Sequence, residues 1–181
     1  EIIGLMRPNS GRVVVCGQDI NRLSEAEMQE IRRRISMVFQ GSALFDSLNV
    51  EENVAYGLKE HDRHIPGDRI RKIVAEKLRL VDLPGTESLY PAELSGGMKK
   101  RVALARALAL DPSIILYDEP TTGLDPANVR RINMLIRRMR DVVGVTSIMV
   151  THDMFSVQAV TDRVALLDEG RILAVGTWGE L

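Results

Sequence analysis

Two short motifs near the middle of the chain constrain its fold more than any other feature. The first, Leu94-Ser95-Gly96-Gly97-Met98, is a glycine-rich loop directly before a segment with helical periodicity. The second reads Ile-Ile-Leu-Tyr-Asp-Glu-Pro over residues 114–120, and it is an apolar strand that ends in two carboxylates. A continuously apolar strand is typical of a parallel sheet that is covered on both faces. The two motifs therefore predict an α/β protein with polar groups at the end of a buried strand.

The rest of the chain alternates between strand and helix patterns. Strands are expected at residues 12–16, 35–39, 114–117, 146–150, 164–167 and 172–175, with turns at 17–19 and 168–171. Helices are expected at 25–33, 50–60, 70–81, 97–110 and 129–143, and a surface loop at 61–68. Ser24 and Glu27 form a capping-box pattern at the start of the first helix. This order predicts a mainly parallel sheet, with the mostly helical segment from about residue 42 to residue 110 inserted within it.

Three of the expected strands end in polar side chains. These side chains are Gln40, Asp118 with Glu119, and Thr151 with His152. Ligands bind outside the carboxyl ends of the strands in an open α/β sheet, and packing of a core does not need polar residues there. We therefore expect these side chains to meet at one edge of the sheet.

The adjacent carboxylates Asp118 and Glu119 suit two tasks in phosphoryl transfer. One carboxylate can hold Mg²⁺, directly or through water, because this hard ion keeps much of its hydration shell. The other can polarise an attacking water molecule. The alternative is a polar strand end with Pro120 as a breaker, which we consider weaker because the motifs occur as an ordered set.

The loop Ser95-Gly96-Gly97 before a helix is an arrangement that binds anions. Glycines let backbone N–H groups approach phosphate oxygens, and the helix dipole adds positive potential. The alternative is a flexible turn in which Ser95 only caps the helix.

Two further polar residues have both a structural and a functional interpretation. His152 follows an apolar strand, where it is either a core histidine or a hydrogen-bond donor to a developing phosphate charge. Asp125 precedes Pro126, a pattern typical of a helix N-cap, and this role is compatible with a place at a dimer face. The arginines between 130 and 140 lie mostly off the apolar stripe Val129, Ile132, Ile136, Met139 and Val143, so we expect a solvated helix face. The sequence shows no zinc-type ligand cluster and no Ser/His/Asp hydrolase pattern.

Composition is typical of a globular protein of one domain. Of 181 residues, 45% are apolar and 27% charged, and the net charge of −1 offers no electrostatic case for a nucleic-acid partner. The single cysteine, Cys16, excludes an intrachain disulfide and follows three valines, so we expect a buried strand residue.

Taken in order, these motifs resemble the nucleotide-binding domain of ABC transporters. The resemblance rests on Gln40, Leu94-Ser95-Gly96-Gly97-Met98, Asp118-Glu119, Gly123-Leu124-Asp125-Pro126 and Thr151-His152-Asp153, and it covers essentially the whole chain. It implies a P-loop NTPase-like ABC ATPase fold with a partial antiparallel β subdomain. It further implies one incomplete domain, with residues 1–41 and 111–181 as catalytic core and residues 42–110 as a helical subdomain.

The same resemblance assigns a role to each site residue. Gln40 would be the Q-loop glutamine that senses Mg²⁺ and the γ-phosphate of ATP, and Asp118 the Walker B aspartate at the metal. Glu119 would be the catalytic glutamate, and His152 the switch histidine. Ser95, Gly96 and Gly97 would form the signature loop, and Asp125 the D-loop. The family works as a head-to-tail dimer with ATP between the copies, joined to integral membrane permease subunits.

One family element is missing from the 181 residues, the phosphate loop G-x-x-x-x-G-K-[ST]. By resemblance it would lie just before Glu1. The sequence starts within a pattern and ends as if another helix began, so we expect a fragment at both ends that binds ATP weakly or not at all by itself.

A narrower resemblance points to a substrate. Residues 39–48 (FQGSALFDSL), residues 52–58 (ENVAYGL) and Met98 in place of the usual signature glutamine look like the Mla-type ATPases of phospholipid transporters in bacterial envelopes. This implies a cytoplasmic protein, peripheral on the inner face of the cell membrane, that powers lipid transport. The alternatives are a soluble ABC ATPase that acts on ribosomes or DNA, and an inactive remnant that only dimerises.

Overall fold

The computed structural model describes residues 2–181, and its centre is a parallel sheet of three strands. The order is β3 (Ile35–Val38), β4 (Ile114–Asp118) and β5 (Thr146–Val150), so β4 lies in the middle. The register pairs Val38 with Tyr117 and Asp118 with Val150. All three carboxyl ends therefore lie at the same edge, as the sequence predicts.

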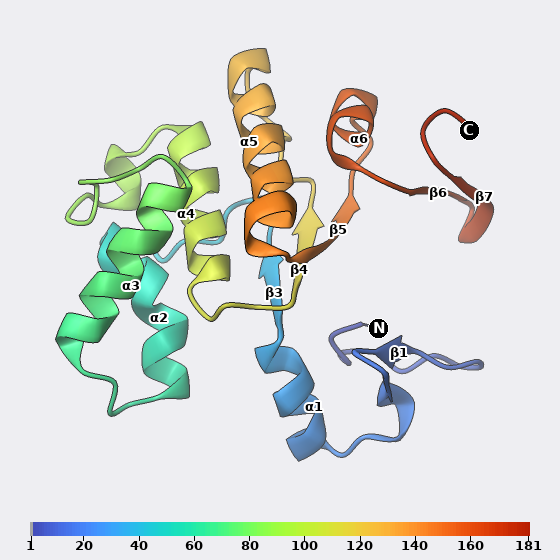
Figure 1. Cartoon of the computed structure of the whole chain (residues 1–181), viewed down its shortest axis with the longest axis horizontal. Helices are drawn as coiled ribbons and strands as arrows, with labels where there is room; N and C mark the ends of the chain where they lie inside the picture. Colours follow the sequence, from blue (N-terminus) through green and yellow to red (C-terminus); the bar gives the residue numbers. More distant parts are fainter. Residues whose placement is uncertain (1) are drawn as a thin grey trace.

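Three helices pack together on one side of the molecule (Figure 1). They are α2 (Val50–His61), α3 (Gly67–Leu80) and α4 (Gly96–Leu108). Their buried residues join β4 and helix α5 (Pro126–Arg138) in one continuous core, with Val54, Leu104 and Ile115 at 0–1% exposure. Helix α4 thereby contacts both the other two helices and the sheet.

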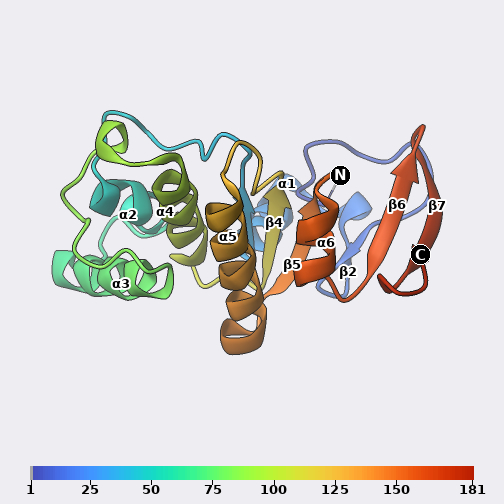
Figure 2. The same ribbon diagram turned by 90° about the horizontal axis from the view of Figure 1, so that it is seen from above.

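The remaining elements lie around the sheet and at the opposite side from α2 and α3 (Figure 2). They are β1 (Val14–Val15), β2 (Gln18–Asp19), α1 (Glu25–Arg33), α6 (Met154–Val160), β6 (Val164–Asp168) and β7 (Arg171–Gly176). Short 3₁₀ turns occur at Ile20–Arg22 and Pro91–Glu93, and a π-helical turn occurs at Met139–Val143. Strands β1–β2 and β6–β7 are antiparallel hairpins, so the molecule combines a parallel sheet with antiparallel ones.

Several boundaries agree with the sequence because local signals set them. Helix α1 begins after Ser24, whose hydroxyl accepts from the Glu27 amide while the Glu27 carboxylate accepts from the Ser24 amide. The predicted turn between β6 and β7 is present, with Glu169 and Gly170 both at positive φ. Strand β4 is less evenly covered than expected, since Ile115 and Tyr117 are buried while Ile114 and Leu116 are only partly buried.

The expectation for Cys16 is wrong. Its side chain is exposed, and it lies in the hairpin turn between β1 and β2 rather than in a strand. Cys16 and Gly17 have φ values of 50° and 81°, which is the geometry of a tight turn that matches strand twist. The valine run predicts the strand, but the turn starts one residue earlier than Gly17.

Two other boundaries differ from the predictions. The expected surface loop at 61–68 is shorter, because α2 extends to His61 and α3 begins at Gly67. Along α5 and the π turn that follows it, the apolar stripe buries Ile132, Ile136 and Met139, but Val143 is 39% exposed. The helix widens into the π turn at this end, and the extra residue rotates Val143 away from the core.

The exposed face of α5 carries arginines, as the sequence predicts, and Arg130, Arg131, Arg137 and Arg138 are all exposed. Within residues 2–181, none of the helices has both the length and the apolar character to cross a membrane.

Candidate active site

Glu119 is the centre of the polar cluster at the carboxyl edge of the sheet. It follows β4 with a positive φ of 46°, and its amide donates to the Val150 carbonyl of β5. Its carboxylate accepts hydrogen bonds from the Thr122 hydroxyl at 3.0 Å and the Thr151 hydroxyl at 3.2 Å. The His152 amide donates to it at 3.2 Å, and His152 Nδ1 lies 2.7 Å from Oε1. Three loop residues therefore orient one carboxylate.

These contacts favour the ionised form of Glu119. The side chain is only 17% exposed, and this burial by itself raises its pKa. The hydrogen bonds from His152, Thr122 and Thr151 and the charge of His152 outweigh burial, so the pKa lies below its ordinary value of 4.5. Glu119 is therefore a carboxylate at neutral pH, and the Nδ1 of His152 carries a proton toward it.

Gln40 reaches the same edge through its backbone. It lies two residues beyond the end of β3, in an exposed position, and its carbonyl accepts a hydrogen bond from Lys100 Nζ. The same ammonium lies 3.4 Å from the carbonyl oxygen of Glu119. The structure thus brings Gln40, Glu119 and His152 together, and Asp118 ends β4 immediately beside them.

The Ser95-Gly96-Gly97 loop forms the N-terminus of α4. Ser95 is the N-cap, and its hydroxyl accepts from the Met98 amide at 3.3 Å. The prediction that Ser95 caps this helix is therefore confirmed. Phosphate binding by the loop stays a prediction. Neither glycine has a positive φ, so backbone conformation does not require them.

The two glycines differ in what surrounds them. A Cβ on Gly97 would lie 2.6 Å from Oδ1 of Asn128, a residue of α5. Among the described residues, a Cβ on Gly96 would meet only Leu124, at an ordinary 3.8 Å. Packing within the chain therefore explains why residue 97 is a glycine, whereas the space beside Gly96 could hold a Cβ.

Asp125 has the capping role that its sequence context predicts. It is the N-cap of α5, accepts from the amides of Ala127 at 2.9 Å and Asn128 at 3.1 Å, and precedes Pro126 at the first helical position. The side-chain amide of Asn128 also donates to it, and these bonds lower the pKa of Asp125. Asn128 thus contacts both Asp125 and Gly97, which places the start of α5 against the start of α4.

Sequence reasoning missed a buried polar network beneath His152. Ser156 of α6 is fully buried, donates to Asp153 at 2.5 Å and accepts from the side-chain amide of Asn133 at 3.0 Å. The Thr121 hydroxyl lies 3.4 Å from Ser156 and 3.5 Å from Asp153. The network joins α5 and α6 to the residue after His152. Its one sequence signal is a polar residue, Asn133, among the apolar positions of α5.

An open hollow of about 640 Å³ lies beside His152. It is lined by the loop after β4, the first turns of α5 and residues 152–155. A hollow of this size accommodates a small ligand or part of a partner protein.

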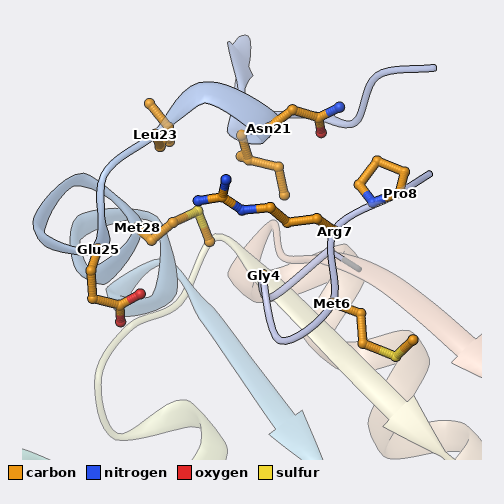
Figure 3. A pocket seen from close by; sticks show the side chains of 9 residues that line it. Gly4, Met6, Arg7, Pro8, Asn21, Leu23, Glu25 and Met28 are labelled. Atoms are coloured by element: carbon orange, nitrogen blue, oxygen red, sulfur yellow. The ribbon is translucent and has the colours of Figure 1, made fainter. Parts of the chain in front are cut away.

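A second hollow near the N-terminal segment has different properties. Its volume is about 100 Å³, and Arg7 extends across it toward Met28 of α1 (Figure 3). It contains none of the predicted site residues and is too small for a nucleotide. In the part of the chain that the structure describes, no group of three or more His, Cys, Asp or Glu side chains forms a metal cage.

The fold and the polar edge define the ATP-binding cassette, and the chain belongs to the ABC transporter family, whose model matches residues 1–122. It is similar to the intermembrane phospholipid transport system ATP-binding protein MlaF of Haemophilus influenzae, with 44% identity over 98% of this chain and 67% of that protein. It is also 46% identical to the methionine import ATP-binding protein MetN 2 of Rhodococcus jostii, over 97% of this chain and 51% of that protein. The chain thus spans about two thirds of one relative and half of the other.

A solved structure shows the same fold. The dimeric, post-hydrolysis ATP-binding cassette MJ0796 bound to ADP and Pi superposes with a TM-score of 0.83 at 34% identity, over 96% of this chain and 75% of that one. The predicted fold class, an ABC ATPase fold with a mainly parallel sheet, is therefore confirmed.

Proposed function

We propose that this chain is the ATP-hydrolysing part of an ABC transporter that moves phospholipid or another lipid in a bacterial envelope. The observation that carries the ATPase assignment is the Glu119–His152 pair at the carboxyl edge of the sheet, with Nδ1 and Oε1 2.7 Å apart. The division into a core (residues 1–41 and 111–181) and a helical subdomain (residues 42–110) remains part of this proposal.

Glu119 is proposed to polarise the attacking water. Its pKa lies below the ordinary value of 4.5, so it is ionised at neutral pH, and an ionised carboxylate can accept a proton from water. His152, 80% exposed in its side chain, uses Nδ1 toward Glu119. When its ring is protonated, Nε2 becomes a second donor, and this donor is proposed to contact a phosphate oxygen of ATP.

The residues at this edge fit Mg²⁺ with ATP. Mg²⁺ keeps several waters and takes one or two protein oxygens, so it does not need a cage of three carboxylates. Asp118 and Gln40 are proposed to supply these oxygens from the ends of neighbouring strands. Bound Mg²⁺ would neutralise charge on the phosphates.

The signature loop is proposed to face the nucleotide held by a second copy of the protein. The N-terminus of α4 is a positive dipole end, and within residues 2–181 a Cβ on Gly96 would meet only Leu124, at 3.8 Å. Asp125 is proposed to lie at the same dimer face. The similarity to a dimeric cassette supports this arrangement.

Membrane permease subunits are proposed to dock beside the Gln40 loop. Phe45 and Tyr56 are exposed by 41% and 42%, their ring centroids lie 4.6 Å apart, and the Arg106 guanidinium lies 6.0 Å from the Phe45 ring. Exposed aromatic pairs with an arginine are typical of protein interfaces. The protein would then be peripheral on the cytoplasmic face of the membrane.

Lipid is the preferred substrate because the MlaF relative and the residue 39–58 motifs agree. Methionine is the competing substrate, because the methionine import protein MetN 2 is 46% identical to this chain. A lipid transporter and a methionine transporter contain different permeases, so identifying the permease that co-purifies distinguishes the two substrates.

The test uses the full-length gene product. Glu119→Gln is expected to lower ATP turnover by about a hundredfold or more and to leave an ATP-stabilised dimer, because the amide cannot accept the proton of water. Glu60→Gln, an exposed position on α2, is the matched control with unchanged turnover. Turnover by Glu119→Gln at the wild-type rate would exclude Glu119 as the base.

The test of the permease contact compares Tyr56→Ala with Trp178→Ala. Trp178 is an exposed aromatic residue two positions beyond the end of β7. Strand β7 lies at the opposite side of the molecule from α2 (Figure 2). The permease is expected to be lost from the pull-down of Tyr56→Ala and retained in the pull-down of Trp178→Ala. A phospholipid-transport permease in the wild-type pull-down supports the lipid proposal, and a methionine permease contradicts it.

A further inference from the structure

Lys100 is a buried cation that no proposed catalytic step uses. It lies on the second turn of α4, is 7% exposed, and donates to carbonyl oxygens rather than to an acidic side chain. A buried ammonium is costly unless it is hydrogen-bonded, and here burial lowers its pKa although Glu119 and Asp118 act in the opposite direction. A lysine in this place therefore needs an explanation from its contacts.

Those contacts join three parts of the site. The Lys100 ammonium donates to the carbonyl of Gln40, beyond the end of β3, and lies 3.4 Å from the carbonyl of Glu119, at the end of β4. Its own helix begins with the Ser95 cap, little more than one turn away. One side chain thus spans two neighbouring strand ends and the helix that carries the signature loop.

The same helix holds the Gln40 loop at a second place. Arg106 donates to the carbonyls of Ser42 at 2.9 Å and Ala43 at 2.6 Å. Ser42 and Ala43 have φ values of 65° and 47°, a conformation that costs non-glycine residues free energy and persists only when the surroundings hold it. Helix α4 therefore constrains both ends of the bend that follows Gln40.

We propose that Lys100 is a positioning residue that couples the Gln40 loop and the Glu119 backbone to the signature helix, so that the three move as one unit. A displacement of the loop would then reach both Glu119 and Ser95 through a single pair of hydrogen bonds. The consequence for catalysis rests on the proposed ATPase function, whereas the coupling itself does not.

The coupling is measured by hydrogen–deuterium exchange on the chain itself. Two amides report on it, Ser42, which donates to the Phe39 carbonyl at 3.0 Å, and Thr122, which donates to the Glu119 carbonyl at 3.3 Å. In Lys100→Met both amides are expected to exchange roughly tenfold faster, while those of α2 and α3 are unchanged, because only local opening is affected.

The neighbouring Lys99 is the matched control. It is partly exposed, and within residues 2–181 its ammonium makes no hydrogen bond or ion pair, so Lys99→Met is expected to exchange as the wild type does. Lys100→Arg, which keeps the charge and the donors, is expected to restore slow exchange. Should Lys100→Met not fold, Lys100→Gln, too short to reach both carbonyls, replaces it in the comparison.

Unchanged exchange at either reporter amide in the Lys100 variant would overturn the proposal, and so would a rise that Lys100→Arg does not reverse. In the full-length gene product, the kcat of Lys100→Met is expected to fall about tenfold with a nearly constant KM, because a misplaced Glu119 affects the chemical step. An inactive wild type would contradict the ATPase proposal alone, whereas an active wild type with an equally active Lys100→Met would contradict the role of Lys100.

Discussion

The side-chain amide of Asn128 occupies the space that a Cβ on Gly97 would need, with Oδ1 only 2.6 Å from that position. By sequence alone, Gly96 and Gly97 are equally suited to let a phosphate approach the backbone. The structure separates them, because Gly97 is required by packing within the chain and Gly96 is not. The Asn128 amide also donates to Asp125, so a change at Gly97 reaches the N-cap of α5.

The first prediction compares alanine at these two positions. Gly97→Ala should be less stable than Gly96→Ala by about 1 kcal/mol, because the new methyl group displaces Asn128 and breaks its hydrogen bond to Asp125. Urea denaturation of the two variants measures the difference in the free energy of unfolding.

A double-mutant cycle is the control for this prediction. In an Asn128→Ala background the penalty at Gly97 should disappear, since the blocking atoms are gone. An equal penalty in both backgrounds would show that Asn128 is not the cause.

The second prediction concerns the pH dependence of stability. The folded-state pKa of Glu119 is lowered, so its contribution to stability is present above its ordinary value of 4.5 and is lost as the pH falls through the folded pKa. The free energy of unfolding of the wild type relative to Glu119→Gln should therefore decrease as the pH falls from about 5 to about 3. Urea denaturation at each pH provides the data.

The threonines test the cause of this dependence. In a Thr122→Val, Thr151→Val variant two of the donors to Glu119 are removed, so the acid-dependent loss should become smaller. The same pH profile with and without these hydroxyls would mean that His152 alone lowers the pKa.

The third prediction concerns the buried network beneath His152. Ser156→Ala should lower the free energy of unfolding by about 1–3 kcal/mol, because the Asn133 amide and Asp153 each lose a partner in a buried place. Asn133→Leu in addition should recover part of the loss, since an unpaired buried polar group is replaced by an apolar one. Thermal or urea unfolding distinguishes the two, and a double variant no more stable than Ser156→Ala would contradict this account.

Local elements follow directly from the order of residues. The capping box at Ser24 and Glu27 sets the start of α1, and the β5 bounds agree with the strand predicted at residues 146–150. Hydrogen bonds between residues three or four positions apart need no tertiary partner, so the local sequence is enough to predict them. The convergence of Gln40, Glu119 and His152 was also predictable, because parallel strands share one carboxyl edge.

Packing between distant segments decided the rest. Lys100 and Gln40 are 60 residues apart in the sequence. The residues around them do not indicate that the Lys100 ammonium donates to the Gln40 carbonyl. The position of Cys16 in a turn depends on where the hairpin turn begins, to within one residue. The rotation of Val143 out of the core likewise depends on one extra residue in the helical turn. The sequence by itself thus determined which polar residues stand at the strand ends. The tertiary structure alone decided which buried side chains hold them there, because such contacts depend on how α4, α5 and α6 pack against the sheet.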